Sequence, residues 1–161
     1  MLTGFTQTIK NLPIWVVPLY GVVVLLAVYI FEYGFGYLPC ELCLYQRQPW
    51  TIVVIGGGLM LMNPIHTKKI LWGLSIVMAF SVALAVFHAG VEYGFWAGLD
   101  SCSSSSDIAT DTSSLLSSLE NSTAPSCDKA VWTLFGISLA GFNAILSLDA
   151  MILFYMMAKS K

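Results

Sequence analysis

The chain has 161 residues and a formal net charge of −2, and 57% of its residues are hydrophobic whereas only 10% are charged. With a mean hydropathy of +0.78 the chain is too apolar for a water-soluble domain, so its composition excludes that class. We therefore expect an integral membrane protein embedded in a lipid bilayer, with no nucleic-acid partner.

Four apolar runs follow one another along the chain. They cover residues 14–31, 44–62, 70–87 and 131–157. Each run meets or nearly meets the length of about 20 residues that crosses the core of a bilayer. Because a backbone in lipid must satisfy its own hydrogen bonds and no run alternates like a barrel strand, we expect helices. The predicted fold is an all-α, four-helix transmembrane bundle that forms one domain over residues 1–161.

Basic residues predict the orientation of this bundle. Lysines precede the first run, separate the second from the third and follow the fourth, at Lys10, Lys68, Lys69, Lys159 and Lys161. The positive-inside rule then places both termini in the cytoplasm and the loops at 32–43 and 89–130 outside. All four cysteines lie in these outer loops. Disulfides persist in such a compartment, which is the periplasm of a bacterium or the lumen of the endoplasmic reticulum.

The second outer loop is rich in serine and predicts one further element. Leu115, Leu116 and Leu119 recur at helical spacing between the serines. We expect a short amphipathic helix here, lying on the membrane surface.

Cys40 and Cys43 form a Cys-x-x-Cys motif in the first outer loop. A disulfide that closes so small a ring removes little entropy from the unfolded chain, so it is a poor structural staple. The two sulfurs are close enough to cycle between dithiol and disulfide, which favours a redox role. Pro39 suits the first position of a helix, whose positive dipole end would favour the thiolate form of these cysteines.

Arg47 follows Cys43 by four residues, which places both side chains on one face of a helix. A guanidinium there can stabilise a thiolate or the oxygen of a reduced acceptor. The alternative is a cation that snorkels to the membrane interface. If the helix began only at Pro49, the motif would lie on a separate turn and the shared face would be lost.

Cys102 and Cys127 are separated by a long loop, and closing it costs more conformational entropy than closing a short rigid one. Their disulfide is therefore easy to reduce and suits the acceptance of electrons from an external thiol. A structural disulfide explains the spacing equally well. A zinc site made of all four cysteines is a third alternative. One Cys-x-x-Cys motif without a second is a poor zinc pattern, so we expect no metal.

His88 lies near the outer end of the third run, with Glu92 four residues further along. His88 can donate a proton or a hydrogen bond to a reduced acceptor, and the alternative is an interfacial residue without a chemical role. Within the fourth run, Asn143 predicts a hydrogen bond between helices, and Asp149 predicts helix packing or snorkelling.

The segment Pro-Cys-Glu-Leu-Cys-Leu-Tyr-Gln-Arg at residues 39–47 stands ahead of the second apolar run and is a specific signature. Together with four runs and a second cysteine pair in the second outer loop, it resembles the bacterial disulfide bond formation protein B (DsbB) family. Residues 87–92 and 125–128 are also similar to that family, so the resemblance covers nearly the whole chain.

The resemblance implies a thiol:quinone oxidoreductase of the bacterial inner membrane. Such an enzyme reoxidises a DsbA-type periplasmic thiol oxidase and so supports disulfide bond formation. In this scheme Cys102 and Cys127 receive electrons from the partner through a mixed disulfide. Cys40 and Cys43 then reoxidise that pair through a transient interloop disulfide.

The terminal acceptor that the resemblance implies is a membrane quinone, either ubiquinone or menaquinone. Cys43 passes electrons to it, Arg47 lies beside a quinone oxygen and polarises it, and His88 lies near the quinone site.

Two alternative functions stay open. One is a vitamin K epoxide reductase-like protein, although in that family the Cys-x-x-Cys motif follows the loop pair instead of preceding it as it does here. The other is a structural membrane protein with two stabilising disulfides.

Overall fold

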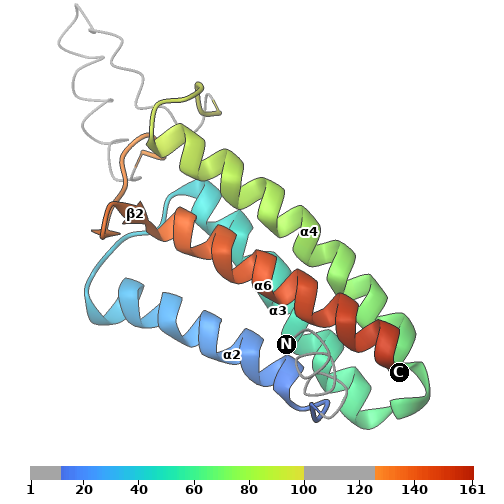
Figure 1. Cartoon of the computed structure of the whole chain (residues 1–161). Helices are drawn as coiled ribbons and strands as arrows, with labels where there is room; N and C mark the ends of the chain where they lie inside the picture. Colours follow the sequence, from blue (N-terminus) through green and yellow to red (C-terminus); the bar gives the residue numbers. More distant parts are fainter. Residues whose placement is uncertain (1–11, 100–125) are drawn as a thin grey trace, which may run out of the picture.

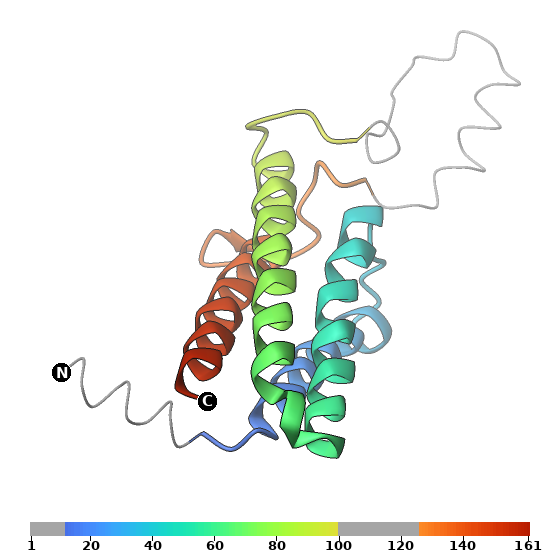
Figure 2. The ribbon, with the colours of Figure 1, turned by 90° about the vertical axis from the view of Figure 1, so that its right-hand side faces the viewer.

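The computed structural model describes residues 12–99 and 126–161, and these residues form a bundle of long α helices. The helices are α2 (Val16–Tyr29), α3 (Glu41–Met62), α4 (Thr67–Glu92) and α6 (Leu139–Ser160). The shorter elements are the π-helix η1 (Ile30–Gly34), the 3₁₀ helix η2 (Pro64–His66) and the strands β1 (Thr133–Leu134) and β2 (Ile137–Ser138). The helices alternate in direction, so the start of α3, the end of α4 and the start of α6 share one end of the bundle (Figures 1 and 2).

Among the described residues, three helical segments are long and apolar enough to cross a membrane. They are Val16–Gly34, Pro64–Glu92 and Leu139–Ser160. The prediction of a mostly helical protein with membrane-spanning segments is supported by these three helices, and the count of four spans stays a prediction. α3 has 22 residues, but its first half carries Gln46, Arg47 and Gln48, which make it less apolar than the other three.

α3 begins within the cysteine motif and continues through Pro49. Cys40 is the N-cap residue, with an extended backbone and a sulfur that accepts a hydrogen bond from the Cys43 N–H at 3.3 Å. Pro39 therefore precedes the helix, and the prediction that it occupies the first helical position is wrong. Because Pro49 does not interrupt α3, Cys43 and Arg47 lie on one helix, as their spacing predicts.

The last helix begins at Leu139, and the prediction of a helix from residue 131 is wrong at its start. β1 and β2 form an antiparallel hairpin there, and its turn residues Phe135 and Gly136 have φ angles of 53° and 80°. A right-handed helix does not contain such residues, and hydropathy does not report them. The Ser138 hydroxyl then caps α6 by accepting a hydrogen bond from the Gly141 N–H.

Tyr93 fastens this hairpin to the end of α4. Its hydroxyl donates to the Gly136 carbonyl at 2.9 Å and accepts from the Ser138 N–H at 3.1 Å. The hairpin is thus held at the end of the bundle where α3 begins.

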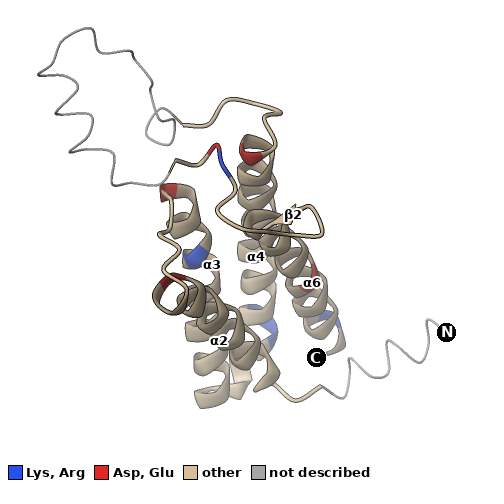
Figure 3. Cartoon of the chain, turned by 90° about the vertical axis from the view of Figure 1, so that its left-hand side faces the viewer, with Lys and Arg blue, Asp and Glu red and all other residues tan. Residues whose placement is uncertain are grey.

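Most charged residues of the described segments lie toward the two ends of the bundle (Figure 3). Lys68 and Lys69 are in the first turn of α4 and Lys159 is in the last turn of α6, at one end. Glu41 opens α3 and Glu92 closes α4 at the other end. The assignment of the lysine end to the cytoplasm stays a prediction.

Two features that the sequence singles out lie outside the described residues. They are Cys102 and the amphipathic helix expected around Leu115, Leu116 and Leu119. Both stay predictions.

Glycines bring α3 close to its neighbours. A Cβ added at Gly57 would lie 2.6 Å from the Cδ and 2.8 Å from the backbone nitrogen of Pro18 in α2. One added at Gly56 would lie 2.9 Å from Leu74 in α4. No methyl group fits at such distances, whereas Gly58 faces open space. The largest buried side chains of the adjoining core are Trp50, Phe154, Met60, Leu71, Met78 and Met157.

Replacing Gly57 with alanine should push α2 away from α3. We expect Gly57→Ala to lower the free energy of unfolding by about 1–3 kcal/mol, the usual cost of overpacking. Gly58→Ala is the matched control, because its methyl group meets no atom and alanine favours a helix over glycine by about 1 kcal/mol. Thermal unfolding in detergent, followed by circular dichroism, measures both variants. Equal midpoints for the two would contradict the close contact between α2 and α3.

Candidate redox site

The free cysteine pair lies at the start of α3. Cys40 and Cys43 are both free thiols, and their sulfur atoms are 2.8 Å apart. A disulfide bond is about 2.05 Å long, so an oxidant that takes two electrons and two protons could close this pair with only a small movement of the sulfurs. Cys40 is 3% exposed, whereas Cys43 is only partly buried. The two members of the pair therefore have different surroundings, and each meets a different part of the site.

Cys127 meets Cys40 from the segment that precedes the hairpin. Cys127 is 1% exposed and is disulfide-bonded in this structure. Its sulfur, the Cys40 sulfur and a ring nitrogen of His88 all lie within 4.8 Å of one another. Leu42 and Val91 pack around them in a small cluster separate from the main core. Three residues that are distant in the sequence thereby share one buried site.

Cys40, His88 and Cys127 are also residue types that bind metals. Zinc binds thiolates, and the sulfur of a disulfide is not a thiolate. With Cys127 disulfide-bonded, the cluster offers Cys40 and His88 alone from this set. The arrangement is suited to exchange between a thiol and a disulfide, in which two sulfurs must approach each other directly.

The Cys40 thiol has the properties of a nucleophile in such an exchange. Its hydrogen bond with Cys43 lowers the pKa of Cys40 below the ordinary value of a thiol, and His88 adds to this shift against the burial that opposes it. The start of α3 acts in the same direction, because a helix N-terminus favours a negative charge. The reactive thiolate of Cys40 therefore persists to lower pH than that of an ordinary cysteine.

His88 lies in α4 and is 1% exposed, which is not the position of an interfacial residue. Its Nε2 atom is 3.5 Å from the Cys40 sulfur and 3.8 Å from Glu92 Oε1. Its Nδ1 atom is 2.8 Å from the side-chain nitrogen of Gln46. The structure therefore places the His88 ring between Cys40 and Gln46, in the interior of the bundle.

Arg47 is paired inside the bundle and does not snorkel. Its guanidinium donates to Glu32 at 2.5 Å and lies 5.3 Å from the ring centre of Tyr29. The Arg47 side chain is 13% exposed, and its Nε atom is buried without a hydrogen-bond partner among the described residues. A buried N–H without a partner is costly, so this position suits an acceptor oxygen from a ligand.

A cavity of about 420 Å³ lies beside Cys43 and Arg47. Its walls come from α2, α3, the hairpin segment and α6, and they are almost entirely apolar. Among its lining residues are Val24, Phe31, Trp132, Leu139, Phe142 and Leu146. A lipophilic molecule in this cavity would therefore lie beside the side chains of Cys43 and Arg47.

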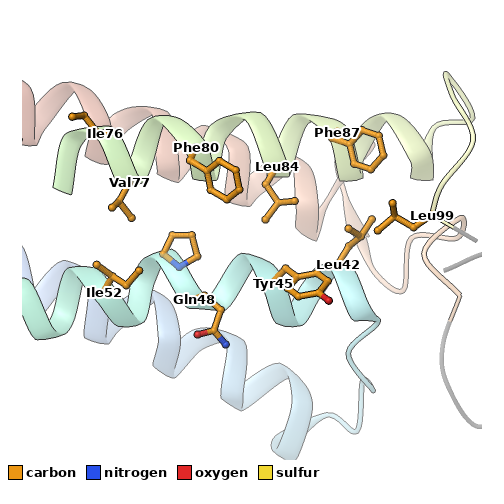
Figure 4. Close-up of a pocket in the computed structure, with 11 residues that line it drawn as sticks. Leu42, Tyr45, Gln48, Ile52, Ile76, Val77, Phe80, Leu84, Phe87 and Leu99 are labelled. Atoms are coloured by element: carbon orange, nitrogen blue, oxygen red, sulfur yellow. The ribbon is translucent and has the colours of Figure 1, made fainter. Parts of the chain in front are cut away.

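A larger cavity, of about 600 Å³, lies between α3 and α4 (Figure 4). Its lining is also apolar, with Leu42, Phe80 and Phe87 among its side chains, and it contains no cysteine or charged residue. The larger volume therefore does not identify the candidate redox site. The smaller cavity is the one whose lining includes a cysteine and an arginine.

Sequence reasoning missed two partners of the site residues. Glu32 pairs with Arg47, and Gln46 contacts His88, yet neither was singled out beforehand. Glu32 is an acidic residue at the end of an apolar run, where a charge is costly without a partner, so its position was a usable signal.

Asn143 does form the predicted hydrogen bonds between helices, with Gln46 and Trp50 of α3. Asp149 accepts a hydrogen bond from Tyr20 of α2.

Similar sequences point to one family. The model of the family described as Disulfide bond formation protein DsbB matches residues 10–157. An uncharacterized protein of Rickettsia prowazekii (strain Madrid E) is 29% identical over 134 residues, which are 82% of this chain and 78% of that protein. No solved structure matches the chain with significant similarity.

A second relative carries a functional name. The "Putative protein-disulfide oxidoreductase DsbI" of Campylobacter jejuni (strain RM1221) is 32% identical over 77 residues. The match covers 48% of this chain and 24% of that protein, so about half of this chain aligns with about a quarter of that relative.

The environment of Cys40 predicts a thiol that ionises below the usual range. With the Cys127 disulfide intact, thiolate ultraviolet absorbance should persist as the pH falls through the range where ordinary thiols protonate, because the pKa of Cys40 is lowered. Cys40→Ala should remove this absorbance. Cys43→Ser keeps a donor to Cys40 and should retain most of the shift, whereas Cys43→Ala should raise the pKa of Cys40. A low-pH thiolate that survives Cys40→Ala would contradict this assignment.

Proposed function

Because this chain belongs to the DsbB family, we propose that it is a membrane thiol:quinone oxidoreductase that reoxidises a DsbA-type periplasmic thiol oxidase. A membrane disulfide oxidoreductase is the activity that the family and the named relative support. The single observation that carries the finer proposal is the approach of the Cys40 and Cys127 sulfurs to within 4.8 Å. Direct exchange between the two outer loops needs such an approach.

The exchange proceeds in steps that balance. The reduced partner first reduces the disulfide between Cys102 and Cys127 and is itself oxidised. The Cys127 thiolate then attacks Cys40 of an oxidised Cys40–Cys43 pair, so that the Cys40–Cys43 bond breaks, a Cys40–Cys127 bond forms and the electron pair leaves on Cys43. Attack by Cys102 on Cys127 finally restores their disulfide and releases Cys40 as a thiolate.

The state after this exchange has free thiols at Cys40 and Cys43 and a disulfide at Cys127. That distribution of thiols is the one described above, which supports this order of steps. Hydrogen bonding from Cys43 favours Cys40 as the leaving thiolate, because a thiol of lower pKa leaves faster.

The cavity beside Cys43 fits a quinone. Its apolar walls suit a lipophilic ring, and the unpartnered Nε–H of Arg47 suits a carbonyl oxygen. A bound quinone supplies the chemistry of a two-electron, two-proton acceptor. Cys43 lines this cavity, and Arg47, held in place by Glu32, would orient an acceptor oxygen and stabilise negative charge on it. Closure of the Cys40–Cys43 disulfide gives up two electrons and two protons from the two thiols, which a quinone held here would accept.

The location that we propose is the bacterial inner membrane, with the cysteine end of the bundle facing the periplasm. The division of charge along the bundle supports this orientation, because Lys68, Lys69, Lys159 and Lys161 lie at the opposite end, whereas of the described lysines only Lys129 is on the cysteine side (Figure 3). A soluble partner would then reach the outer loops, while a membrane quinone, ubiquinone or menaquinone, would enter the bundle from the lipid.

The relay predicts that quinone reduction needs both cysteine pairs. Mixing the purified protein in detergent with reduced partner and a soluble quinone analogue, followed by stopped-flow absorbance, should show catalytic reduction. Cys43→Ser and Cys127→Ser should each reduce the rate to background while the helices stay folded. In Cys43→Ser, oxidation should join Cys40 to Cys127, as peptide mapping under non-reducing conditions would show. A folded Cys43→Ser protein with normal turnover would overturn the relay.

The cavity predicts a specific role for the arginine. Arg47→Lys keeps the charge but removes the Nε–H, and a hydrogen bond of a charged group is worth about 1.5–3 kcal/mol. We therefore expect kcat/KM for the quinone analogue to fall roughly 10- to 100-fold. Exchange between the partner and the outer cysteines should keep its rate in this variant, measured by trapping mixed disulfides with acid. An equal loss in both reactions would mean that Arg47 supports the fold and not the acceptor site.

A further inference from the structure

A line of hydrogen bonds runs from Trp50 to His88 through the interior of the bundle. Trp50 Nε1 donates to Asn143 Oδ1 at 2.8 Å, and Asn143 Nδ2 donates to Gln46 Oε1 at 2.9 Å. Gln46 Nε2 then lies 2.8 Å from His88 Nδ1, and His88 Nε2 faces the Cys40 sulfur at 3.5 Å. The line joins α3, α6 and α4 and ends at a reacting cysteine.

The direction of this line follows from its first member. An indole N–H can only donate, so the Asn143 atom that faces Trp50 must be the oxygen. The amide nitrogen of Asn143 then faces Gln46 and requires the oxygen of that side chain. The nitrogen of Gln46 is left to face His88, and it too can only donate. Flipping either amide would place two donors against each other.

His88, the last member of the line, can therefore carry the proton of its neutral ring on only one of its two nitrogens. His88 Nδ1 must accept from Gln46, so the proton of the neutral imidazole is on Nε2. Nε2 is the atom that faces Cys40. The Trp50 N–H, at the other end of the line, thereby determines the state of His88 Nε2. This atom directs an N–H, and not a lone pair, at the Cys40 sulfur.

We propose that Gln46, Asn143 and Trp50 are positioning residues that fix the Nε2–H tautomer of His88, so that this N–H stabilises Cys40 whenever it becomes a thiolate. The inference rests on the proposed function, in which Cys40 is released as a thiolate by each exchange. The opposite tautomer would direct a lone pair at the thiolate, which is repulsive. The role of the three residues is exerted through His88, and none of them touches the Cys40 sulfur in the contacts described above.

The other groups around His88 in the described contacts face Nε2, whereas Gln46 faces Nδ1. Glu92, on the same helix, has Oε1 at 3.8 Å from Nε2, and its Oε2 has no hydrogen-bond partner among the described residues. A carboxylate there also favours a proton on Nε2. Cys40 approaches from the start of α3, and Cys127 from the segment before the hairpin. Among these groups, only Gln46 faces Nδ1. Its N–H requires a lone pair on that nitrogen and so favours the Nε2–H tautomer.

Nitrogen NMR of selectively labelled histidine tests the inference directly. The chain has two histidines, and the exposed His66 serves as an internal reference. We expect His88 to show the Nε2–H tautomer in the unsubstituted protein. A lone pair on Nε2 or an equal mixture of tautomers in that protein would overturn the proposal, and this outcome requires no variant to fold.

Variants at the far end of the line provide the second test. Trp50→Phe removes the donor that sets the direction, and Asn143→Leu breaks the line between Trp50 and Gln46. In both, His88 should show mixed tautomers, and thiolate absorbance of Cys40 should titrate about one pH unit higher, which is a tenfold lower thiolate fraction. Ser81→Ala is the matched control, because it removes a buried hydrogen bond between α4 and α6 outside the line, with Ser147.

The outcomes separate this inference from the proposed function. Both measurements use the protein without partner or quinone, so they do not depend on turnover. Failure of quinone reduction with a fixed tautomer would overturn the proposed function alone. Unchanged tautomer and Cys40 titration in folded Trp50→Phe and Asn143→Leu proteins would overturn the positioning role alone. Equal changes in Ser81→Ala would do the same, because a general loss of packing would then explain them.

Discussion

The approach of Cys40 to Cys127 is the contact on which the rest of the site depends. It requires the start of α3 to lie against the segment before the hairpin, and the hairpin is held there by Tyr93 at the end of α4. As the N-cap residue, Cys40 holds its sulfur at the first turn of α3, where it accepts a hydrogen bond from the Cys43 N–H and lies within 4.8 Å of the Cys127 sulfur. The start of a helix within the motif thus positions the thiol next to Cys43, and the hydrogen bond from the Cys43 side chain is the main cause that lowers the pKa of Cys40.

α3 organises two kinds of chemistry on its first turns. Cys43 and Arg47 are four residues apart and line the apolar cavity, while Gln46 and Trp50, also four apart, join the line of hydrogen bonds to His88. The sulfur that lies beside Cys127 and the sulfur that lines the cavity are therefore adjacent but differently surrounded. In the function proposed above, this division lets one cysteine pair exchange with the outer-loop disulfide on one side and with a lipophilic acceptor on the other.

Much of the fold was predictable because it depends on local properties of the chain. Apolar runs of sufficient length predicted helices, since transfer into lipid is a sum over neighbouring residues. The start of α6 was not predictable in this way, because residues 131–138 are apolar enough to continue a helix. Phe135 and Gly136 instead adopt positive φ angles in a hairpin that Tyr93 holds from another helix. Hydropathy depends on residue type and does not report backbone φ angles, so it does not predict such a turn.

The candidate redox residues were recognisable from the sequence, because a Cys-x-x-Cys spacing and an arginine one turn later bring their groups together on any helix. What each of these groups faces depends on the tertiary structure. His88 could have faced lipid or Cys40, and Asn143 could have joined any neighbouring helix. The choice depends on how α3, α4 and α6 rotate against one another as they pack. That rotation is set by contacts between residues distant in the chain, and no local pattern encodes it.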